Sequence, residues 1–156
     1  MPPEARERII FAALMLFARK GYASTSVADI LHDAGVNAGS LYYFFPGKQD
    51  VLLAVLEVYQ RGIHPMLLEP AWKDVSDPIE RVFALLERYR GALASTECTY
   101  GCPIGSLALE LHEPDPAVRA LLAANFAGWV DAIEACFVDA GDRLPSDVDR
   151  LQSAVS

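Results

Sequence analysis

The stretch TSVADILHDAGVNAGSLYYFFPGK, residues 25–48, contains the signals of a helix, a tight turn and a second short helix. Thr25 or Ser26 is expected to cap the first helix, with Asp29 three residues after Ser26 as in a capping box. Gly35 supplies the left-handed residue that ends this helix. Two helices joined by about three residues that include a glycine have the geometry of a helix-turn-helix that binds DNA. An ordinary helical hairpin in a bundle has the same spacing, so spacing alone leaves both interpretations open.

Apolar residues in the same stretch recur at helical spacing. In the first helix they fall at i, i+3, i+4 and i+7, which predicts one buried face: Val27, Ile30, Leu31 and Ala34. Asn37 is a strong N-cap for a second helix of about two turns, which directs Leu41 and Phe45 inward. Pro46 and Gly47 then end that helix.

The rest of the sequence predicts helices alone, because helix formers dominate and sustained β-type alternation is missing. The first helix is expected to bury Ile10, Ala13, Leu14 and Phe17 and to end at Gly21, and a long helix then begins at Lys48 and is kinked or ended by Pro65. A loop over 70–78 precedes a helix that begins at Pro78 behind the cap Asp77, and a break over 95–103 precedes a short helix over 104–113. A long helix from Pro116 to Ala140 is stopped by Gly141, and one more helix opens within 145–156. The helix after Pro78 shows an apolar stripe of Ile79, Val82, Phe83, Leu86, Tyr89 and Leu93. The predicted fold class is all-α.

Charge is distributed unevenly along the chain. The net charge is −8, which argues against a protein that coats polyanions in general. Residues 1–50 contain five Lys or Arg and five acidic residues, so the whole deficit lies in residues 51–156. A neutral N-terminal part on an acidic remainder is compatible with DNA binding in which the phosphate contribution is modest.

The cysteine count and the first apolar run indicate the compartment. Three cysteines, an odd number, do not suggest a disulfide scaffold and fit a reducing cytoplasm. The run IIFAALMLFA at 9–18 resembles a signal-peptide core, but Glu4 and Glu7 precede it and Arg19 and Lys20 follow it. It is also shorter than a membrane span. We therefore expect a soluble, cytoplasmic protein without membrane association.

Residues 5–57 resemble the TetR/AcrR family of bacterial transcriptional repressors. The similarity rests on an ordered set of motifs: AALMLFARKGY at 12–22, AGV at 34–36 and the LYYFF-P-x-K block at 41–48. It implies an N-terminal three-helix DNA-binding domain of the helix-turn-helix type, placed at residues 1–47. It also implies a homodimer whose partner is a double-stranded DNA operator.

The resemblance implies a set of DNA contacts. These residues are Thr25, Ser26, Asn37, Ala38, Gly39, Ser40, Tyr42, Tyr43 and Lys48. Ala38, Gly39 and Ser40 stand where the family approaches the major groove, while the tyrosine hydroxyls and Lys48 are expected to contact phosphates. One of the two tyrosines could instead be a core residue, and capping is the safer role for Thr25 and Ser26.

The sequence departs from the family within this set. Many relatives have a lysine where Ala38 stands and a histidine where Phe44 stands. Both differences weaken phosphate attraction and leave fewer bidentate contacts. Specificity is then expected to depend on apolar contact with thymine methyl groups, backbone donors and DNA shape.

Residues 48–156 resemble the ligand-binding and dimerisation domain of the same family, and GCPIGSLALEL at 101–111 is similar to a subgroup that includes regulators of multidrug-resistance genes. The resemblance implies a pocket for a small hydrophobic or aromatic inducer, for which we select His64, Tyr89, Tyr100, Cys102, Leu107, Phe126 and Trp129. Relatives usually continue for two more helices that build most of the dimer interface. This sequence stops at Ser156, inside the first of them, so the domain lacks its last helices: either the chain is truncated or it dimerises differently.

Metal and thiol chemistry are not expected. Cys98 and Cys102 lie four residues apart, but further ligands would have to come from the scattered His64, His112 and Cys136. No paired CxxC or HxxxH spacing supports a site. The cysteines are interpreted as reduced and partly buried, and no metal or cofactor is predicted.

Enzymatic function is not expected either. The sequence contains no Gly-rich phosphate loop, no GxSxG and no HExxH. Glu110, His112 and Glu113 form a cluster near a helix end, where exposed polar residues are common. The leading prediction is a DNA-binding transcriptional repressor released from its operator by a small hydrophobic ligand. The alternative is a helical module that binds a small molecule or a partner and no longer binds DNA.

Overall fold

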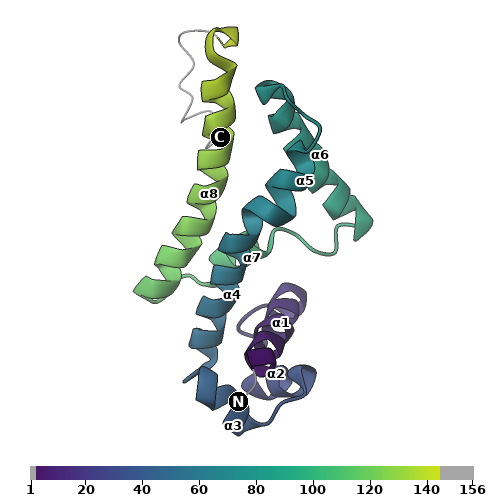
Figure 1. Ribbon diagram of the computed structural model, residues 1–156. Coiled ribbons are helices and arrows are strands. Elements are labelled where there is room, and N and C mark those ends of the chain that lie inside the picture. Colours follow the sequence, from purple (N-terminus) through teal and green to yellow (C-terminus); the bar gives the residue numbers. More distant parts are fainter. Residues whose placement is uncertain (1–2, 145–156) are drawn as a thin grey trace. The chain divides into compact units, whose positions relative to one another are not determined.

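The computed structural model describes residues 3–144, and every regular element in this range is helical (Figure 1). The elements are α1 (Pro3–Lys20), α2 (Val27–Ala34), α3 (Ala38–Phe44), α4 (Lys48–Gly62), η1 (Ile63–Leu68), α5 (Glu69–Trp72), α6 (Pro78–Ser95), α7 (Pro103–Glu110), α8 (Pro116–Ala140) and η2 (Gly141–Arg143). The all-α prediction is confirmed. The helix expected within 145–156 lies outside the described residues.

Packing divides the chain into two compact units. The head unit comprises residues 1–59 and 100–122, and the body unit comprises residues 60–99 and 123–156. The helices α4 and α8 each run from one unit into the other along the chain. The sequence predicted that the DNA-binding domain ends at residue 47. This boundary stays a prediction, and the packing groups the first turns of α4 with the helices before it.

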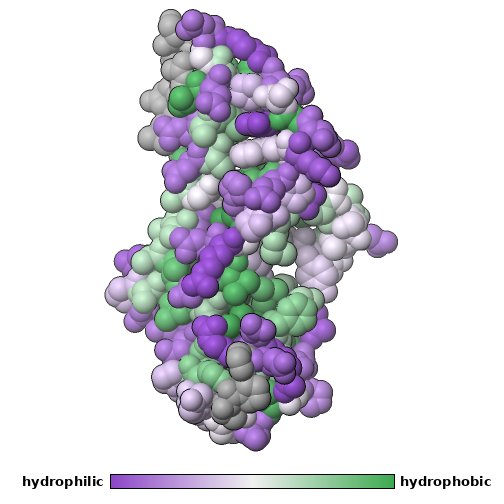
Figure 2. Space-filling model, viewed as in Figure 1, coloured by the Kyte–Doolittle hydropathy of each residue, from purple (hydrophilic) through white to green (hydrophobic). Residues whose placement is uncertain are grey.

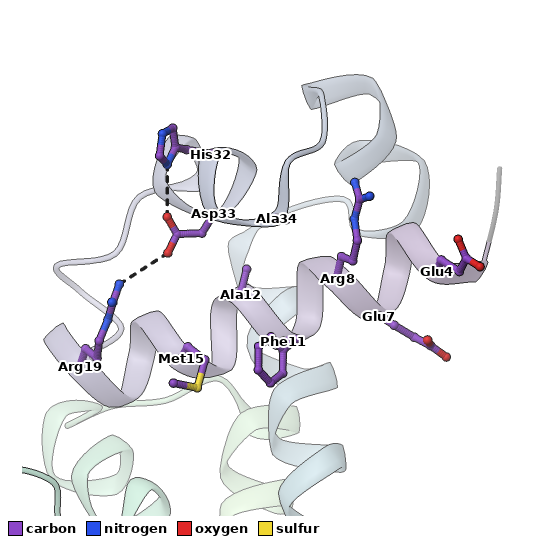
Figure 3. Close-up of a pocket in the computed structure, with 10 residues that line it drawn as sticks. All are labelled: Glu4, Glu7, Arg8, Phe11, Ala12, Met15, Arg19, His32, Asp33 and Ala34. Atoms are coloured by element: carbon purple, nitrogen blue, oxygen red, sulfur yellow. Dashed lines mark hydrogen bonds and ion pairs between the residues drawn. The ribbon is translucent and has the colours of Figure 1, made fainter. Parts of the chain in front are cut away.

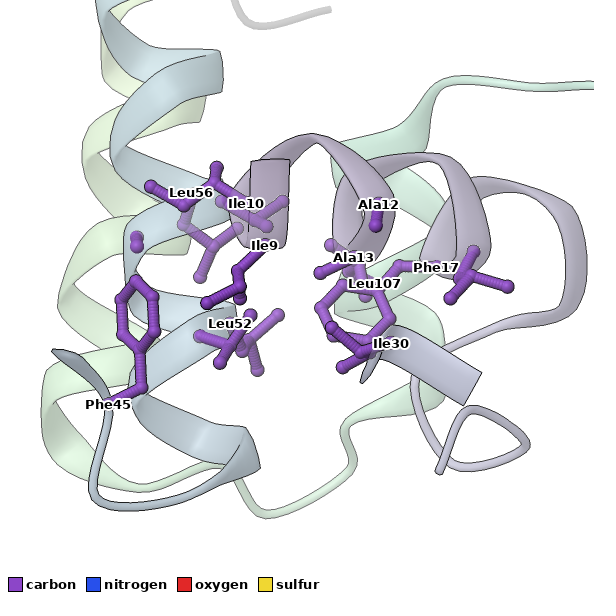
Figure 4. Close-up of a cluster of buried hydrophobic side chains, with 14 of the residues drawn as sticks. Ile9, Ile10, Ala12, Ala13, Phe17, Ile30, Phe45, Leu52, Leu56 and Leu107 are labelled. Atoms are coloured by element: carbon purple, nitrogen blue, oxygen red, sulfur yellow. The ribbon is translucent and has the colours of Figure 1, made fainter. Parts of the chain in front are cut away.

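The head unit has one apolar core built by helices distant in sequence (Figure 4). Its centre is filled by the fully buried Ile9 of α1, Ile30 of α2, Leu41 of α3 and Leu52 of α4. Leu107 of α7 joins the same cluster. Because burial of each such side chain contributes about 1.5–3 kcal/mol, this core fixes α2 and α3 against α1.

Local sequence signals explain the starts and ends of the helices in the head. Ser26 and Asp29 form a complete capping box at the start of α2, and Gly35 ends it in the left-handed conformation at φ 61°. Asn37 caps α3 by accepting a hydrogen bond from the Ser40 amide at 2.8 Å. Gly21, at φ 83°, follows the end of α1. All of these predictions from local sequence are confirmed.

Pro65 does not end the helical path of the chain, although α4 itself ends three residues before it, at Gly62. Pro65 lies inside the π-helical segment Ile63–Leu68, which joins α4 to α5 without a loop. A proline lacks the amide hydrogen that an α-helix requires, and the wider π-turn is one way for the chain to continue past it. The loop expected over 70–78 is therefore shorter, because α5 extends to Trp72 before the chain turns and Asp77 caps α6.

The apolar stripe predicted on α6 lies largely in contact with solvent. Phe83 and Leu86 are 55% and 57% exposed, and only Leu85 on this helix is buried. Apolar residues also appear among polar ones on the visible face of the molecule (Figure 2). The spacing on α6 correctly predicted a helix, but it placed several of these side chains in a core that the described part of the chain does not provide.

Two stretches, Lys48–Trp72 and Pro116–Arg143, are long and apolar enough to cross a membrane by length and composition. Core helices of soluble helical proteins meet the same criterion, so this finding is weak evidence. Our expectation that the protein does not associate with a membrane stays a prediction.

Candidate nucleic-acid interface

The turn between α2 and α3 is held by one side chain from α1. The guanidinium of Arg8 donates a hydrogen bond to the carbonyl oxygen of Gly35 at 2.8 Å. Ile30 and Leu41 anchor α2 and α3 in the core from the inner side. The two helices therefore form a supported helix-turn-helix, and their outer faces are left free to contact a partner.

The outer face of α3 presents polar and aromatic groups to solvent. Asn37, Ala38 and Gly39 are exposed at its first turn. Tyr42 and Tyr43 are 54% and 68% exposed. The Tyr43 ring packs edge-on against Phe44, with ring centroids 4.9 Å apart. Because more than half of each tyrosine is exposed, neither tyrosine is a core residue.

The start of α2 lies beside a well-bonded acidic group. The Asp29 carboxylate accepts hydrogen bonds from the amide and hydroxyl of Ser26, both at 2.7 Å, and the ammonium of Lys20 lies 2.9 Å away. The bond from Lys20 is the main reason that the pKa of Asp29 lies well below its usual range. Ser26 is exposed and available for a phosphate contact in addition to its capping role.

Thr25 is not available for the DNA contact that the family resemblance implied. Its side chain is 1% exposed, and its hydroxyl donates to the carbonyl of Gly21 at 2.7 Å. The cap of α2 is Ser26. The Thr25 hydroxyl is thus part of the loop before α2, and we omit Thr25 from the DNA-contacting set proposed below.

Lys48 has an internal role that the sequence did not indicate. Its ammonium donates to the carbonyl oxygens of Tyr22 and Thr25, each at 2.8 Å, and lies 4.1 Å from the centre of the Tyr22 ring. Burial lowers the pKa of Lys48, and the negative charge of Glu110 opposes this shift. An ammonium has three donors, so one remains for a phosphate after these two bonds.

An open groove of about 920 Å³ runs between α1 and α2 (Figure 3). Phe11 and Met15 of α1 line it and are exposed. At one end, Asp33 bridges Arg19 and His32, at 3.5 Å and 3.2 Å. Groups of both charges line this groove, and they do not favour one class of ligand.

The residues predicted to line an inducer pocket are divided between the two units. In the body unit, Tyr89 and Trp129 contact each other with ring centroids 5.0 Å apart. His64 lines a separate groove of about 610 Å³ and lies 3.1 Å from the Glu69 carboxylate. Phe126 is 44% exposed.

The other three selected residues belong to the head unit. Leu107 is only 3% exposed and fills the head core, so its predicted role in a pocket is not supported by its position. Cys102 is the N-cap of α7, where its sulfur accepts a hydrogen bond from the Gly105 amide at 3.5 Å. Tyr100 precedes it and is exposed.

Among residues 3–144, no group of three or more His, Cys, Asp or Glu side chains is arranged to hold a metal ion. Cys98 and Cys102 are exposed thiols, whereas Cys136 is buried. Cys98 and Cys102 fall in different units.

One residue central to the head was not selected from the sequence. The carboxylate of Glu110, at the end of α7, accepts hydrogen bonds from the amides of Tyr22 and Ala23 at 2.8 Å and 2.6 Å. The sequence placed Glu110 in an exposed polar cluster with His112 and Glu113. The role of Glu110 depends on a contact between residues 88 positions apart, and a local sequence pattern contains no signal for such a contact.

The family profiles match the two parts of the chain in order. The profile "Bacterial regulatory proteins, tetR family" matches residues 9–55, and "Transcriptional regulator LmrA/YxaF-like, C-terminal domain" matches residues 78–149. The chain belongs to the TetR family of transcriptional regulators. Its relatives are regulators and not enzymes, as the sequence predicted.

Individual relatives and solved structures agree with this assignment. The uncharacterized helix-turn-helix regulator Rv0196 of Mycobacterium tuberculosis H37Rv is 31% identical over 147 residues, which cover 91% of this chain and 73% of the relative. The transcriptional repressor DhaR of Mycobacterium sp. strain GP1 is 30% identical, covering 86% of this chain and 66% of DhaR. The crystal structure of a TetR regulatory protein from Rhodobacter sphaeroides superposes with a TM-score of 0.85 at 30% identity, covering 97% of this chain and 81% of that one. The chain spans between 62% and 73% of the length of the first five curated relatives it matches.

Proposed function

We propose that this chain is a cytoplasmic transcriptional repressor that binds an operator as a homodimer. Each copy places α3 in a major groove, and the two copies occupy grooves about 34–36 Å apart on one face of B-DNA. A small hydrophobic ligand bound in the body unit then releases the operator. Release requires that the ligand bind the DNA-free state better than the DNA-bound state.

The observation that supports DNA binding is the exposed face of α3 on a buried, capped scaffold. Asn37, Ala38 and Gly39 are exposed at the start of the helix, and the exposed Tyr42 and Tyr43 follow on the same short helix. Ser26 and the third donor of Lys48 lie at the starts of the neighbouring helices α2 and α4. Hydroxyl, amide and ammonium donors of this kind contact phosphates and position a recognition helix.

A titration of the upstream DNA of the gene tests this function. Fluorescence anisotropy should detect saturable binding to a specific duplex, with Tyr43→Phe weakening it at least about fivefold because one hydroxyl contact is lost in each copy of the homodimer. The variant Tyr100→Phe removes an exposed hydroxyl elsewhere and should leave the affinity unchanged. If the wild-type protein binds no duplex specifically at low salt, DNA recognition by this chain is refuted.

The support for ligand binding lies in the body unit. The 610 Å³ groove is lined by Ile63 and Leu68 on one side and by small residues of α8, including Gly128, on the other. Small-molecule sites are mainly apolar with a few polar groups, and His64 and Asp131 provide such groups here. The dye 1-anilinonaphthalene-8-sulfonate should bind saturably, and Gly128→Leu should reduce this by filling the groove. Equal dye binding by the variant would place the ligand elsewhere.

One observation favours the alternative, a helical ligand- or partner-binding module that does not bind DNA. Lys48, the lysine or arginine nearest to α3 in sequence, is bonded to two carbonyl groups of its own chain. Salt dependence separates the two functions, since DNA affinity falls as salt increases and a hydrophobic contact does not weaken in this way.

A further inference from the structure

A single loop in the head, residues 21–25 between α1 and α2, is held from two sides. Lys48 of α4 donates to two of its carbonyl oxygens. Glu110 of α7 accepts from two of its amides, those of Tyr22 and Ala23. Two amides and two carbonyl oxygens of the loop are thus bonded by two charged side chains that come from helices outside the helix-turn-helix.

The contact at Glu110 is a close fit. Two successive amides directed at one carboxylate form an anion-binding concavity, and bonds to a charged acceptor are stronger than neutral ones. Gly21 adopts φ 83°, and a β-carbon there would lie 2.9 Å from a Glu110 oxygen. The left-handed glycine therefore gives the loop its shape and leaves room for the carboxylate.

The loop sets the position at which α2 begins. The buried Thr25 hydroxyl bonds back to Gly21, and Ser26 follows at once as the N-cap of α2. Arg8 then holds the turn after α2 at Gly35. A change in the loop therefore acts directly on the orientation of α2, and through the short turn on α3.

The chain connects Glu110 to the body unit by a short path. Glu110 is the last residue of α7, whose Ile104 and Leu107 lie in the head core. Residues 111–115 lead into α8, which continues into the body unit. Lys48 begins α4, which also continues into the body unit. Lys48 therefore lies on a helix that extends into the proposed ligand-binding part, and Glu110 lies a few residues before another such helix.

We propose that Glu110 is a positioning residue for DNA recognition: its carboxylate keeps the 21–25 loop in the shape that presents α2 and α3, and its withdrawal lowers DNA affinity. This inference rests on the proposed function and specifies how α7 regulates the DNA-binding site. A ligand that displaces α7 would remove two hydrogen bonds from the loop at once. Glu110 itself does not contact DNA in this proposal.

Two variants and a matched control test the inference. Glu110→Gln keeps the size of the side chain but has only one oxygen acceptor, and Glu110→Ala removes both acceptors. The control Glu113→Gln removes the same charge from an exposed residue three positions further on. Anisotropy on a duplex that the wild-type protein binds should show affinity reduced about tenfold for Glu110→Ala, somewhat less for Glu110→Gln, and unchanged for the control. The slope of affinity against salt should not change, because no phosphate contact is lost.

Amide hydrogen exchange supplies a readout that does not require DNA. In both Glu110 variants the amides of Tyr22 and Ala23 should exchange faster, while amides of the α4 core keep their protection. By linkage, adding the duplex to the wild-type protein should slow exchange at these two amides. A purely structural role would lower the thermal midpoint without this DNA-dependent protection.

The outcomes distinguish this inference from the proposed function. Unchanged exchange at Tyr22 and Ala23 in the variants, or faster exchange with unchanged DNA affinity, overturns the role of Glu110 while DNA binding stands. Absence of specific DNA binding by the wild-type protein refutes both, and the exchange data then report only the loop contact. If Glu110→Ala fails to fold, Glu110→Gln decides by the same measurements.

Discussion

Asp29 concentrates three hydrogen-bond donors on one carboxylate at the start of α2. Bonds from Lys20 and then Ser26 hold its pKa below the usual value of 3.8. A carboxyl group whose pKa is lowered in the folded state stabilises that state above its unfolded pKa, and this contribution is lost as the pH falls through the folded value. We expect Asp29→Asn to lower the thermal midpoint at pH 6 and to lower it less at pH 3, as measured by circular dichroism. The exposed Asp74→Asn should show no such difference, and an equal effect of Asp29→Asn at both pH values would contradict the linkage.

Lys48 allows its internal and DNA-binding roles to be separated by measurement. Replacement by methionine leaves the Tyr22 and Thr25 carbonyl oxygens without their charged donor. Because hydrogen bonds to charged groups are among the stronger ones, we expect Lys48→Met to lower the free energy of unfolding by about 1–2 kcal/mol. Urea denaturation measures this, with the exposed Lys73→Met as the control. Unchanged stability with lost DNA affinity would instead show that the ammonium acts mainly on phosphate.

At the scale of elements, two glycines in open space should respond in opposite directions. A β-carbon at Gly35 or Gly91 would meet nothing within 4 Å. Gly35 ends α2 at φ 61°, where an L-residue is strained, so Gly35→Ala should destabilise by about 1 kcal/mol. Gly91 lies within α6, so Gly91→Ala should stabilise by about 0.5–1 kcal/mol. Denaturant midpoints measure both changes, and the same sign for both would contradict the backbone argument.

The elements also show which parts of the fold the sequence could predict. Caps act within four residues, so Ser26, Gly35, Asn37 and Asp77 marked the helix ends correctly. Pro65 was different, because whether a helix stops or widens into a π-turn depends on what surrounds it. The exposed faces of α3 followed from its short apolar pattern together with the family resemblance.

Contacts between distant segments were beyond the local pattern. The periodicity of α6 predicted a helix correctly, but which of its apolar residues are buried depends on the helices that pack there, and Phe83 and Leu86 are exposed. Lys48 and Glu110 were chosen for DNA contact and an exposed cluster, respectively, whereas both bond to the loop between α1 and α2. Side-chain bonds of this kind depend on the assembled core and have no signature in sequence spacing.

At the scale of the whole molecule, the charge distribution limits how much of the DNA affinity can come from phosphates. The protein has a net charge of −8, and its first 50 residues carry no net charge. Since log affinity changes with log salt by about −0.9 for each phosphate neutralised, a dimer with one or two cations per copy should show a slope of about −2 to −4. A much steeper slope, measured by anisotropy between roughly 50 and 200 mM salt, would require phosphate contacts from cations outside the proposed contact set.

A lysine introduced at Ala38 tests whether the lack of a cation at the start of α3 limits the phosphate contribution to DNA affinity. Ala38 is exposed at the first turn of α3, so a lysine there should reach a phosphate in each half-site. We expect Ala38→Lys to strengthen binding at low salt and to steepen the slope by about 2 for the dimer. The control Ala117→Lys makes the same change in net charge at an exposed position in the first turn of α8 and should leave the slope unchanged. Equal slopes for the two variants would mean that the start of α3 does not lie against the DNA backbone, because the charge would then act only through the field of the whole protein.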